Sequence, residues 1–450
     1  MKIKLILCFS LLSVFSGFSQ EKPQETKQSF TLQEAIDYAI ENNRNAKNAS
    51  RDVEAAYKQK WETIAIGLPQ LNGQIDYQNN LKQQVNVIPS DFEDPDSPLV
   101  PVVFGAKQNL SASASLSQLI FDGSYIVGLQ SAKVFLEISK NAKEKTDLEV
   151  RKGTINAYGN VLLSEETVAI LKENRATLQK NLDETTKIFE NGLEEEESVE
   201  QLKITLADIE SALNRSERVR EVSLQMLNMT MGLDIKHPTT LLDNLETLTA
   251  RNVNLGLISD PFTVEDNIDY QIAENDKTSK ELLIKLAKSD AMPSINAFFN
   301  GGYNSFGDDF TFFDKGQDYF GFAVFGVGMN IPIFSSGGRS AATQRAKIDY
   351  AKASDDLIET EQRIKLDIAT AQSDYQYSIE DYSNKKESLD LAERIEAKNQ
   401  TKFFEGIASS FELRQAQIQL YTAQQEFLQA MLDVITKKAT LETLLNRINQ

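Results

Sequence analysis

The chain contains the stretch Ile331-Pro332-Ile333-Phe334-Ser335-Ser336-Gly337-Gly338-Arg339, which joins two different sequence patterns. The residues before it, 320–334, are apolar and strand-like, and no proline follows it up to residue 450. Because proline interrupts helix interiors, such a run permits a very long helix. A shorter version, Leu119-Ile120-Phe121-Asp122-Gly123, lies within an earlier proline-free run, residues 102–237. The sequence therefore predicts a strand-to-helix junction that is used twice.

Two further signatures recur in the two halves of the chain. Residues 30–38 and 262–270 share Phe, Thr, Ile, Asp and Tyr at matching positions, and each precedes a Pro-x-(Leu/Ile)-Asn sequence, at 69–72 and 293–296. Thr31 and Glu34 form a capping box, which predicts a helix that continues to about Ile66. We interpret the chain as an internal duplication, about 30–232 and 262–448.

The duplication divides the chain into four parts. They are a signal peptide (1–19), a first repeat (20–232), a connecting segment around the middle of the helices (233–261) and a second repeat (262–450). Each repeat is expected to contain a helix, a pair of strands and a helical hairpin.

Three of the four expected strands alternate between polar and apolar residues. In residues 71–79, 110–117 and 295–303, apolar or small side chains occupy one face and mostly polar or small ones the other. The fourth strand, within 320–334, is apolar on both faces, so alternation does not fix its register. Loops at 80–106 and 304–319 join the strands of each pair; their acidic clusters match no EF-hand spacing, and we expect solvated loops. The strand lengths fit either an ordinary sheet or a membrane barrel.

The two proline-free runs predict helical hairpins. Gly192 and Gly406 lie well inside these runs, where a hairpin would turn. The arms would be about 65 and 40 residues long, and the longer arm would span about 100 Å. Helices of this length require a packed seam. Spacings of 3 and 4 produce one in the last helix, at Leu413, Ala416, Leu420, Ala423, Phe427, Ala430 and Val434.

Composition excludes several classes of function. Residues 1–19 have the charged start, apolar centre and small-residue end of a signal peptide. Cys8, the only cysteine, lies inside the apolar centre and not at its end, so lipidation is not expected, and the mature chain has no thiol. The net charge of −19 argues against nucleic-acid binding. The single histidine, His237, and the absence of phosphate-loop or serine-elbow motifs argue against an enzyme, a cofactor or a metal site.

Four strands are too few for a membrane barrel. About eight strands are the fewest that close, and open strand edges are not tolerated in lipid. Membrane strands would therefore require several copies of the chain to share one barrel, with the helical hairpins forming a tube that continues it. Such an assembly is a duct.

These features together resemble the TolC-like outer-membrane efflux protein family over residues 30–448. The resemblance rests on the duplication, the junction motif, the Ala-Lys pairs at 132–133 and 346–347, and the glycine-centred hairpin tips. It implies a mainly α fold with β strands, in which three copies form a periplasmic α-helical barrel and a shared 12-strand transmembrane β-barrel. It further implies a passive exit duct that works with a periplasmic adaptor and an inner-membrane pump, in efflux or type I secretion.

The resemblance also points to site residues. In the family, acidic rings after the second hairpin tip close the periplasmic end. Here Glu412 matches the first acidic position, and Gln415 replaces the second acid, which implies a weaker cation trap. Glu200, near the first tip, is expected to add charge at the same entrance. The tips themselves match the adaptor-contacting region, at Gly192, Leu193, Gly406 and Ile407.

An alternative hypothesis, from a different class of function, is a secreted structural coiled-coil envelope protein without channel activity. The alternating strands argue against it. The sequence does not identify the cargo, which could be a small molecule, a metal ion or a secreted protein.

Overall fold

The computed structural model describes residues 29–446 apart from 92, 95 and 259–260. The predicted signal peptide and Cys8 lie outside these residues. The first half of the chain contains β1 (Ser29–Phe30), α1 (Leu32–Asn42), α2 (Arg44–Ile66), β2 (Gln70–Asn79), β3 (Val85–Pro89), β4 (Leu99–Val103), β5 (Gln108–Phe121), α3 (Gly123–Glu190) and α4 (Glu196–Met231). The second half contains β6 (Thr240–Leu241), α5 (Leu245–Asn252), the 3₁₀ turns η1 (Leu255–Ile258) and η2 (Val264–Asp266), α6 (Ile268–Ser289), β7 (Ser294–Gly307), β8 (Phe320–Asn330), α7 (Gly338–Phe404) and α8 (Ser410–Leu444).

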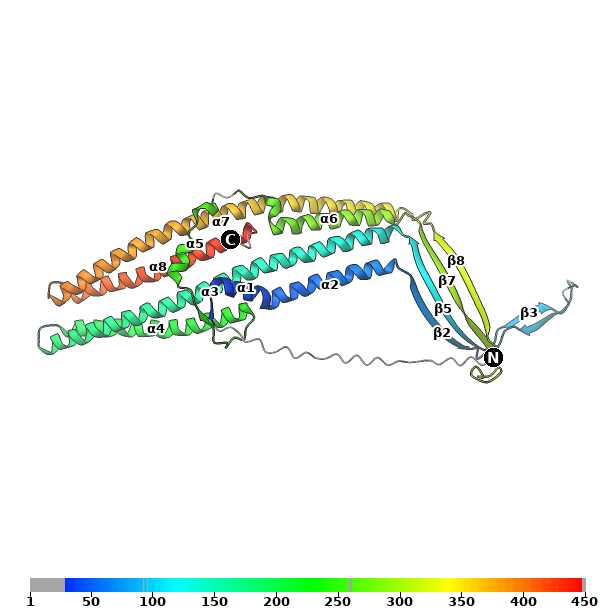
Figure 1. Ribbon diagram of the computed structural model, residues 1–450, viewed down its shortest axis with the longest axis horizontal. Coiled ribbons are helices and arrows are strands. Elements are labelled where there is room, and N and C mark those ends of the chain that lie inside the picture. Colours follow the sequence, from blue (N-terminus) through cyan, green and yellow to red (C-terminus); the bar gives the residue numbers. More distant parts are fainter. Residues whose placement is uncertain (1–28, 92, 95, 259–260, 447–450) are drawn as a thin grey trace.

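Two long helical hairpins dominate the molecule, and their prediction is confirmed (Figure 1). α3 has 68 residues and α4 has 36, whereas α7 has 67 and α8 has 35. At 1.5 Å per residue, α3 and α7 are each about 100 Å long. Both tips point away from the sheet, so one chain places strands at one end and hairpin tips at the other.

The seam predicted along α8 is confirmed. Five residues of the seam are buried: Leu413, Ala416, Ala423, Ala430 and Val434. The other two, Leu420 and Phe427, are half-buried. On α7, Ile364, Ile368 and Tyr375 are buried in the facing layer. Apolar burial along the whole length supplies the stability that helix propensity alone does not give to helices of this size.

The first helix is divided in two, contrary to the prediction of one helix from Thr31 to Ile66. The Thr31 capping box is present, but α1 ends at Asn42 and α2 begins at Arg44. The Asn43 side chain accepts hydrogen bonds from the first backbone amides of α2, and its Nδ2 donates to the Thr230 carbonyl at 2.7 Å. An asparagine that caps a new helix and ties it to α4 outweighs the helical periodicity around it.

The second repeat does not open as the first does. Thr263 was expected to match Thr31, but it precedes only the 3₁₀ turn η2 and makes no side-chain cap. Asn267 begins α6 instead, since its side chain accepts from the amides of Asp269 and Tyr270. Asn267 Nδ2 also donates to the Leu444 carbonyl at 2.7 Å, which fixes this helix start against the end of α8.

Four antiparallel strands form the main sheet in the order β2-β5-β7-β8, and the prediction of four such strands is confirmed. Their register gathers most of the polar side chains on one face, and β8 is apolar on both faces. One face is apolar or small, with Leu71, Ile75, Tyr77, Leu110, Ala112, Leu116, Phe299, Tyr303, Phe325 and Val327. The other face carries Asn72, Gln74, Asp76, Gln78, Ser111, Ser113, Ser115, Asn300 and Asn304. Within the described residues, β2 and β8 each have one edge with no strand beside it.

Residues 80–106 are not simply a loop. They contain the β3–β4 hairpin, which projects beyond the end of the sheet (Figure 1). Its strands combine valines, Leu99 and Ile88, and valine and isoleucine favour extended backbone. The acidic residues that were assigned to the loop lie around its turn.

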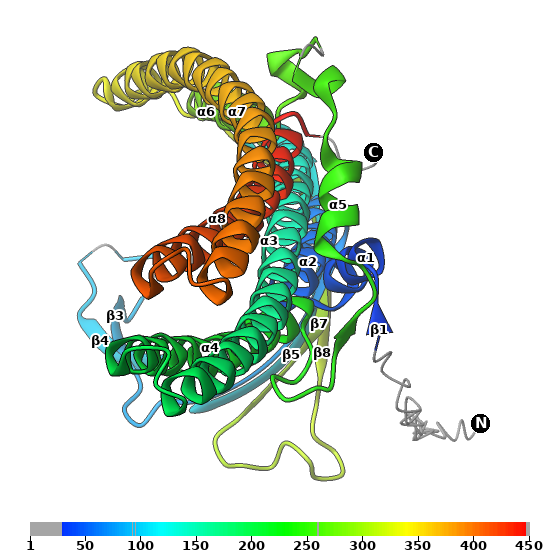
Figure 2. The same cartoon turned by 90° about the vertical axis from the view of Figure 1, so that its left-hand side faces the viewer.

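Viewed end-on, the helices form an arc, with α1 and α5 against its convex side (Figure 2). The largest buried cluster lies where α1, α3, α4, α5 and α8 meet. At its centre, the Tyr158 hydroxyl donates to the Phe30 carbonyl at 2.9 Å and to Asp243 at 3.0 Å. The short segments near the middle of the hairpins thus hold the two repeats together. None of the helices in the described part of the chain is long and apolar enough to cross a membrane.

Candidate functional site

The strand-to-helix junction fixes the sheet on the helices. Arg339, in the first turn of α7, donates from Nη1 to the Pro332 carbonyl at 2.8 Å and from Nη2 to the Ile333 carbonyl at 3.3 Å. The turn before it requires Gly337, whose φ of 82° is left-handed. In the first repeat, Asp122 caps α3 instead, and the Ser124 hydroxyl that donates to it lowers the pKa of its carboxyl.

The two hairpin tips have the same geometry. Gly192 and Gly406 have φ values of 77° and 73°. The next amide, of Leu193 or Ile407, donates back to the carbonyl of Ile188 or Lys402 at 3.1 and 2.8 Å. This is the Schellman arrangement, which needs a left-handed residue. Leu193 is 79% exposed and Ile407 is 70% exposed, so each tip presents an apolar side chain to solvent.

Glu412 lies at the start of α8, immediately beyond the second tip. Its carboxylate accepts from the Ser409 amide at 2.8 Å, and its own amide donates to the Ser409 hydroxyl at 3.3 Å. These bonds form a capping box, and the bond from the Ser409 amide is the first cause of the lowered pKa of Glu412. The side chain therefore stays ionised and exposed. Its capping role was missed from the sequence, although the Ser-x-x-Glu spacing signals it.

Gln415 lies nearly one turn after Glu412 and is exposed, as is Glu200 on α4. A small apolar cleft lies near these residues, and both hairpins contribute to it. Its lining consists of Gln201, Leu202, Thr205, Phe403, Ser410, Leu413 and Arg414. The structure thus brings the beginnings of α4 and α8 together at one end of the molecule. Both predicted gate residues adjoin this cleft in sequence, because Glu200 precedes Gln201 and Glu412 precedes Leu413.

The contact between the two hairpins in this half of the molecule is partly polar. Asn174 Nδ2 donates to Gln424 Oε1 at 2.9 Å, and Gln400 Nε2 donates to Asn181 Oδ1 at 3.0 Å. Within the described residues, buried Gln417 has neither side-chain polar atom in a hydrogen bond. Inside the first hairpin, by contrast, α3 and α4 meet through a cluster of valines, leucines and isoleucine. A polar contact gains less from burial than an apolar one, so it separates at lower cost.

Two titratable groups border this polar contact. Burial raises the pKa of Glu396 on α7. Burial, and secondly the Glu396 charge, raise the pKa of Tyr421 on α8. A half-buried carboxyl is thus poised to change charge at the contact between the hairpins.

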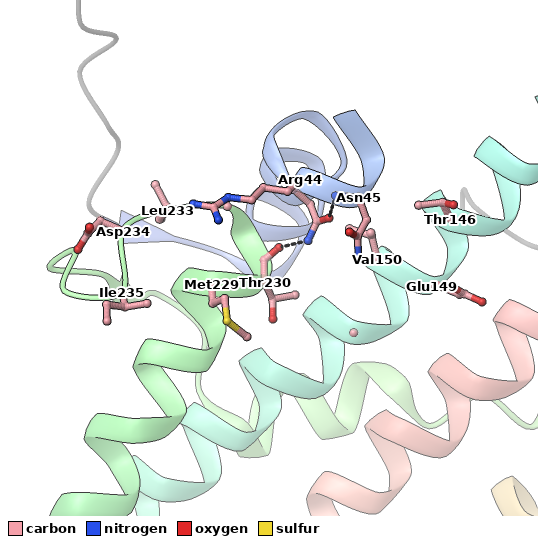
Figure 3. A pocket seen from close by; sticks show the side chains of 13 residues that line it. Arg44, Asn45, Thr146, Glu149, Val150, Met229, Thr230, Leu233, Asp234 and Ile235 are labelled. Atoms are coloured by element: carbon pink, nitrogen blue, oxygen red, sulfur yellow. Dashed lines mark hydrogen bonds between the residues drawn. The ribbon is translucent and has the colours of Figure 1, made fainter. Parts of the chain in front are cut away.

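A separate cleft lies away from the tips, beside the break between α1 and α2 (Figure 3). It has a volume of about 640 Å³ and is lined by residues of α2, α3 and the end of α4. Asn43 and Thr230, which are joined by a hydrogen bond, both line it. None of the predicted site residues lines it.

Within the described residues, no three His, Cys, Asp or Glu side chains gather as metal ligands. The one ion pair with both side chains deeply buried among these residues, Arg151 with Glu442 at 2.8 Å, joins α3 to α8. Lys438 lies 3.3 Å from the same carboxylate, so the charges are paired inside the helical core.

Comparison with known proteins agrees with this architecture. Residues 267–447 match the model of the outer membrane efflux protein family. The chain is 23% identical to the outer membrane protein TolC of Vibrio cholerae, across 93% of this chain and 91% of the relative. Among solved structures, CusC has a TM-score of 0.74 at 19% identity, covering 92% of each chain. The Campylobacter jejuni outer membrane channel CmeC has a TM-score of 0.72 at 17% identity, covering 93% of this chain and 87% of that one.

The match extends through both repeats, and it agrees with the resemblance of the sequence motifs. Its second repeat matches the model of the outer membrane efflux protein family, and nearly the whole chain is similar to TolC.

Proposed function

We propose that three copies of this chain form a passive exit duct through the outer membrane. The observation that carries the proposal is the four-stranded sheet, with one apolar face, one mainly polar face and, in the described part of the chain, no strand beside the outer edges of β2 and β8. Lipid contact explains the apolar face, and a water-filled lumen explains the polar one. Because open edges are not tolerated in lipid, β2 of one copy must pair with β8 of the next. Three copies give a barrel of 12 strands.

The helices support the same assembly. They form an arc with a concave side (Figure 2), and three arcs joined side by side would enclose a tube. α3 and α7 would extend this tube about 100 Å into the periplasm. The signal peptide predicted at residues 1–19 is consistent with export to that compartment. Domain limits of 20–232, 233–261 and 262–450 follow from the repeat.

The hairpin tips are the proposed gate and docking region. Exposed Leu193 and Ile407, on rigid glycine turns, present apolar contacts to a periplasmic adaptor, which in turn binds an inner-membrane pump. Glu412, Gln415 and Glu200 would surround the entrance. The polar contact between the hairpins would let 338–448 move away from α3 when an adaptor docks. Cargo would pass without catalysis, a cofactor or a bound metal, in efflux or in type I secretion.

Membrane extraction followed by bilayer recording tests the duct. We expect carbonate and high salt to leave the protein in the outer-membrane fraction, because its apolar sheet face lies in lipid. Detergent should release it, and the purified protein should produce channels in a planar bilayer. Release by carbonate, with no channel activity, would instead support a coiled-coil envelope protein.

A further inference from the structure

The strand β8 has large apolar side chains on both of its faces, and lipid contact accounts for only one of them. The pairing of β8 with β7 shows which of these side chains lie on each face of the sheet. Phe325 lies opposite Phe299 on the apolar face of the sheet. Phe322 and Val324 lie opposite Gly302 and Asn300, on the face that carries the serines and asparagines. In a barrel with its apolar face in lipid, these side chains face the lumen.

The lumen-facing apolar residues form a continuous strip. It consists of Phe306, Phe320, Phe322, Val324 and Phe298. The rings of Phe306 and Phe320 are 6.1 Å apart. At the other end, the Phe298 ring covers Gly326, where an added Cβ would lie 2.5 Å from it. At 3.3 Å per residue the strip extends roughly 25 Å along the sheet, close to the height of a membrane barrel wall.

The chain itself leaves this strip open. Phe306, Phe320, Phe322 and Val324 are 48%, 58%, 38% and 51% exposed. The connection between β7 and β8 could have covered them, but it folds over the other face. Its Phe312 is fully buried and lies 6.0 Å from the ring of Tyr77, which belongs to the apolar face. The strip therefore remains available to molecules in the lumen.

The surroundings of the strip indicate what it contacts. Beside it, the same face carries Asn300, Asn304 and the β5 serines, which are neutral hydrogen-bonding groups. Asp76 is the one charged residue on this face of the four described strands, and Gln74 Nε2 donates to it at 3.1 Å. A wall with an apolar strip beside neutral polar groups, and with little charge, complements a molecule that has both an apolar and a polar part.

We propose that this strip carries the aromatic or aliphatic part of amphiphilic small molecules along the barrel wall while the asparagines and serines solvate their polar part. The proposal rests on the duct proposed above and specifies its cargo class. Shallow contact with exposed rings is favourable enough to hold such a molecule briefly and weak enough to release it, as conduction requires.

A pair of probes that differ only in an apolar group tests the strip. Phenyl β-glucoside and methyl β-glucoside share a sugar, and only the former carries a ring. In planar bilayers containing the full-length purified protein, phenyl β-glucoside should interrupt the ion current for times about tenfold longer than methyl β-glucoside does. The double variant F320S/F322S should lose this difference. The matched control F325S, on the same strand but on the opposite face of the sheet, should keep it.

Two measurements show whether each variant assembles. They are the mass of its particle in detergent solution and the current through its open channel in salt without either probe. If F320S/F322S does not assemble, the single variant Phe322→Asn places at that position a residue type that already lines the wall, and it should shorten the interruptions. If both probes interrupt the current of working wild-type channels for equal times, the proposed role of the strip is wrong, whereas the proposed duct is not contradicted. Absence of channels in the wild type would overturn both.

Discussion

Glu412 combines two roles that different substitutions separate. Its carboxylate caps α8 through Ser409, and it places a negative charge next to the second tip. Glutamine keeps a side-chain oxygen that accepts the Ser409 amide, but removes the charge; alanine removes both. We expect Glu412→Gln to weaken block of the channel by divalent cations without loss of folding, and Glu412→Ala also to lower the thermal stability of the hairpin tip.

Bilayer conductance with and without Mg²⁺, together with thermal unfolding followed by circular dichroism, measures both effects. Gln415→Ala serves as the control, because this neighbour is uncharged and exposed. Unchanged cation block in Glu412→Gln would remove Glu412 from the gate.

The tip glycines are required by backbone conformation. Gly406 has a φ of 73° and lies in open space, so only the backbone opposes a side chain. Gly406→Ala should destabilise the second hairpin by about 1 kcal/mol, because alanine tolerates the left-handed region poorly. Gly406→Asn should cost less, since asparagine adopts this region more readily. Chemical unfolding in detergent measures the difference, and equal stability of all three proteins would contradict this account of the turn.

Between elements, the contact of α3 with α7 and α8 should respond to pH. Burial raises the pKa of Glu396, so protonation favours the packed arrangement of the hairpins. This contribution is complete below the ordinary glutamate value of 4.5 and is lost as the pH rises through the raised value. We therefore expect wild-type channels to conduct less as the pH falls from about 7 to about 4.

Glu396→Gln should remove much of this dependence, because glutamine has no charge to lose. Glu393→Gln, on the exposed side of the same helix, is the matched control and should retain it. A pH dependence that is identical in wild type and Glu396→Gln would show that this carboxyl does not act at the contact.

At the scale of the whole molecule, the repeated features were predictable from sequence and the local exceptions were not. Long proline-free runs and seams with spacings of 3 and 4 specify the hairpins, because many residues contribute to each. Single residues decide the exceptions. The break at Asn43 and the start of α6 at Asn267 both depend on an amide that reaches a distant carbonyl, of Thr230 and of Leu444, which sequence periodicity does not report.

The candidate site shows the same division. The positions of the tip glycines followed from their isolation within the helical runs, and their φ values explain why glycine is needed. The polar contact between the hairpins, including Gln417 and Glu396, joins residues on different helices. The lumenal strip depends on strand register, because Phe320 to Asn330 is apolar on both faces and alternation alone does not orient it.

The shared barrel is the central claim, and the native mass of the detergent-extracted protein tests it most directly. The outer edges of β2 and β8, which have no partner strand among the residues that the structure describes, predict that the particle, after correction for bound detergent, contains three chains. A soluble monomer or dimer that needs no detergent would contradict the account, because a single four-stranded sheet would then exist without the neighbours that close it in lipid.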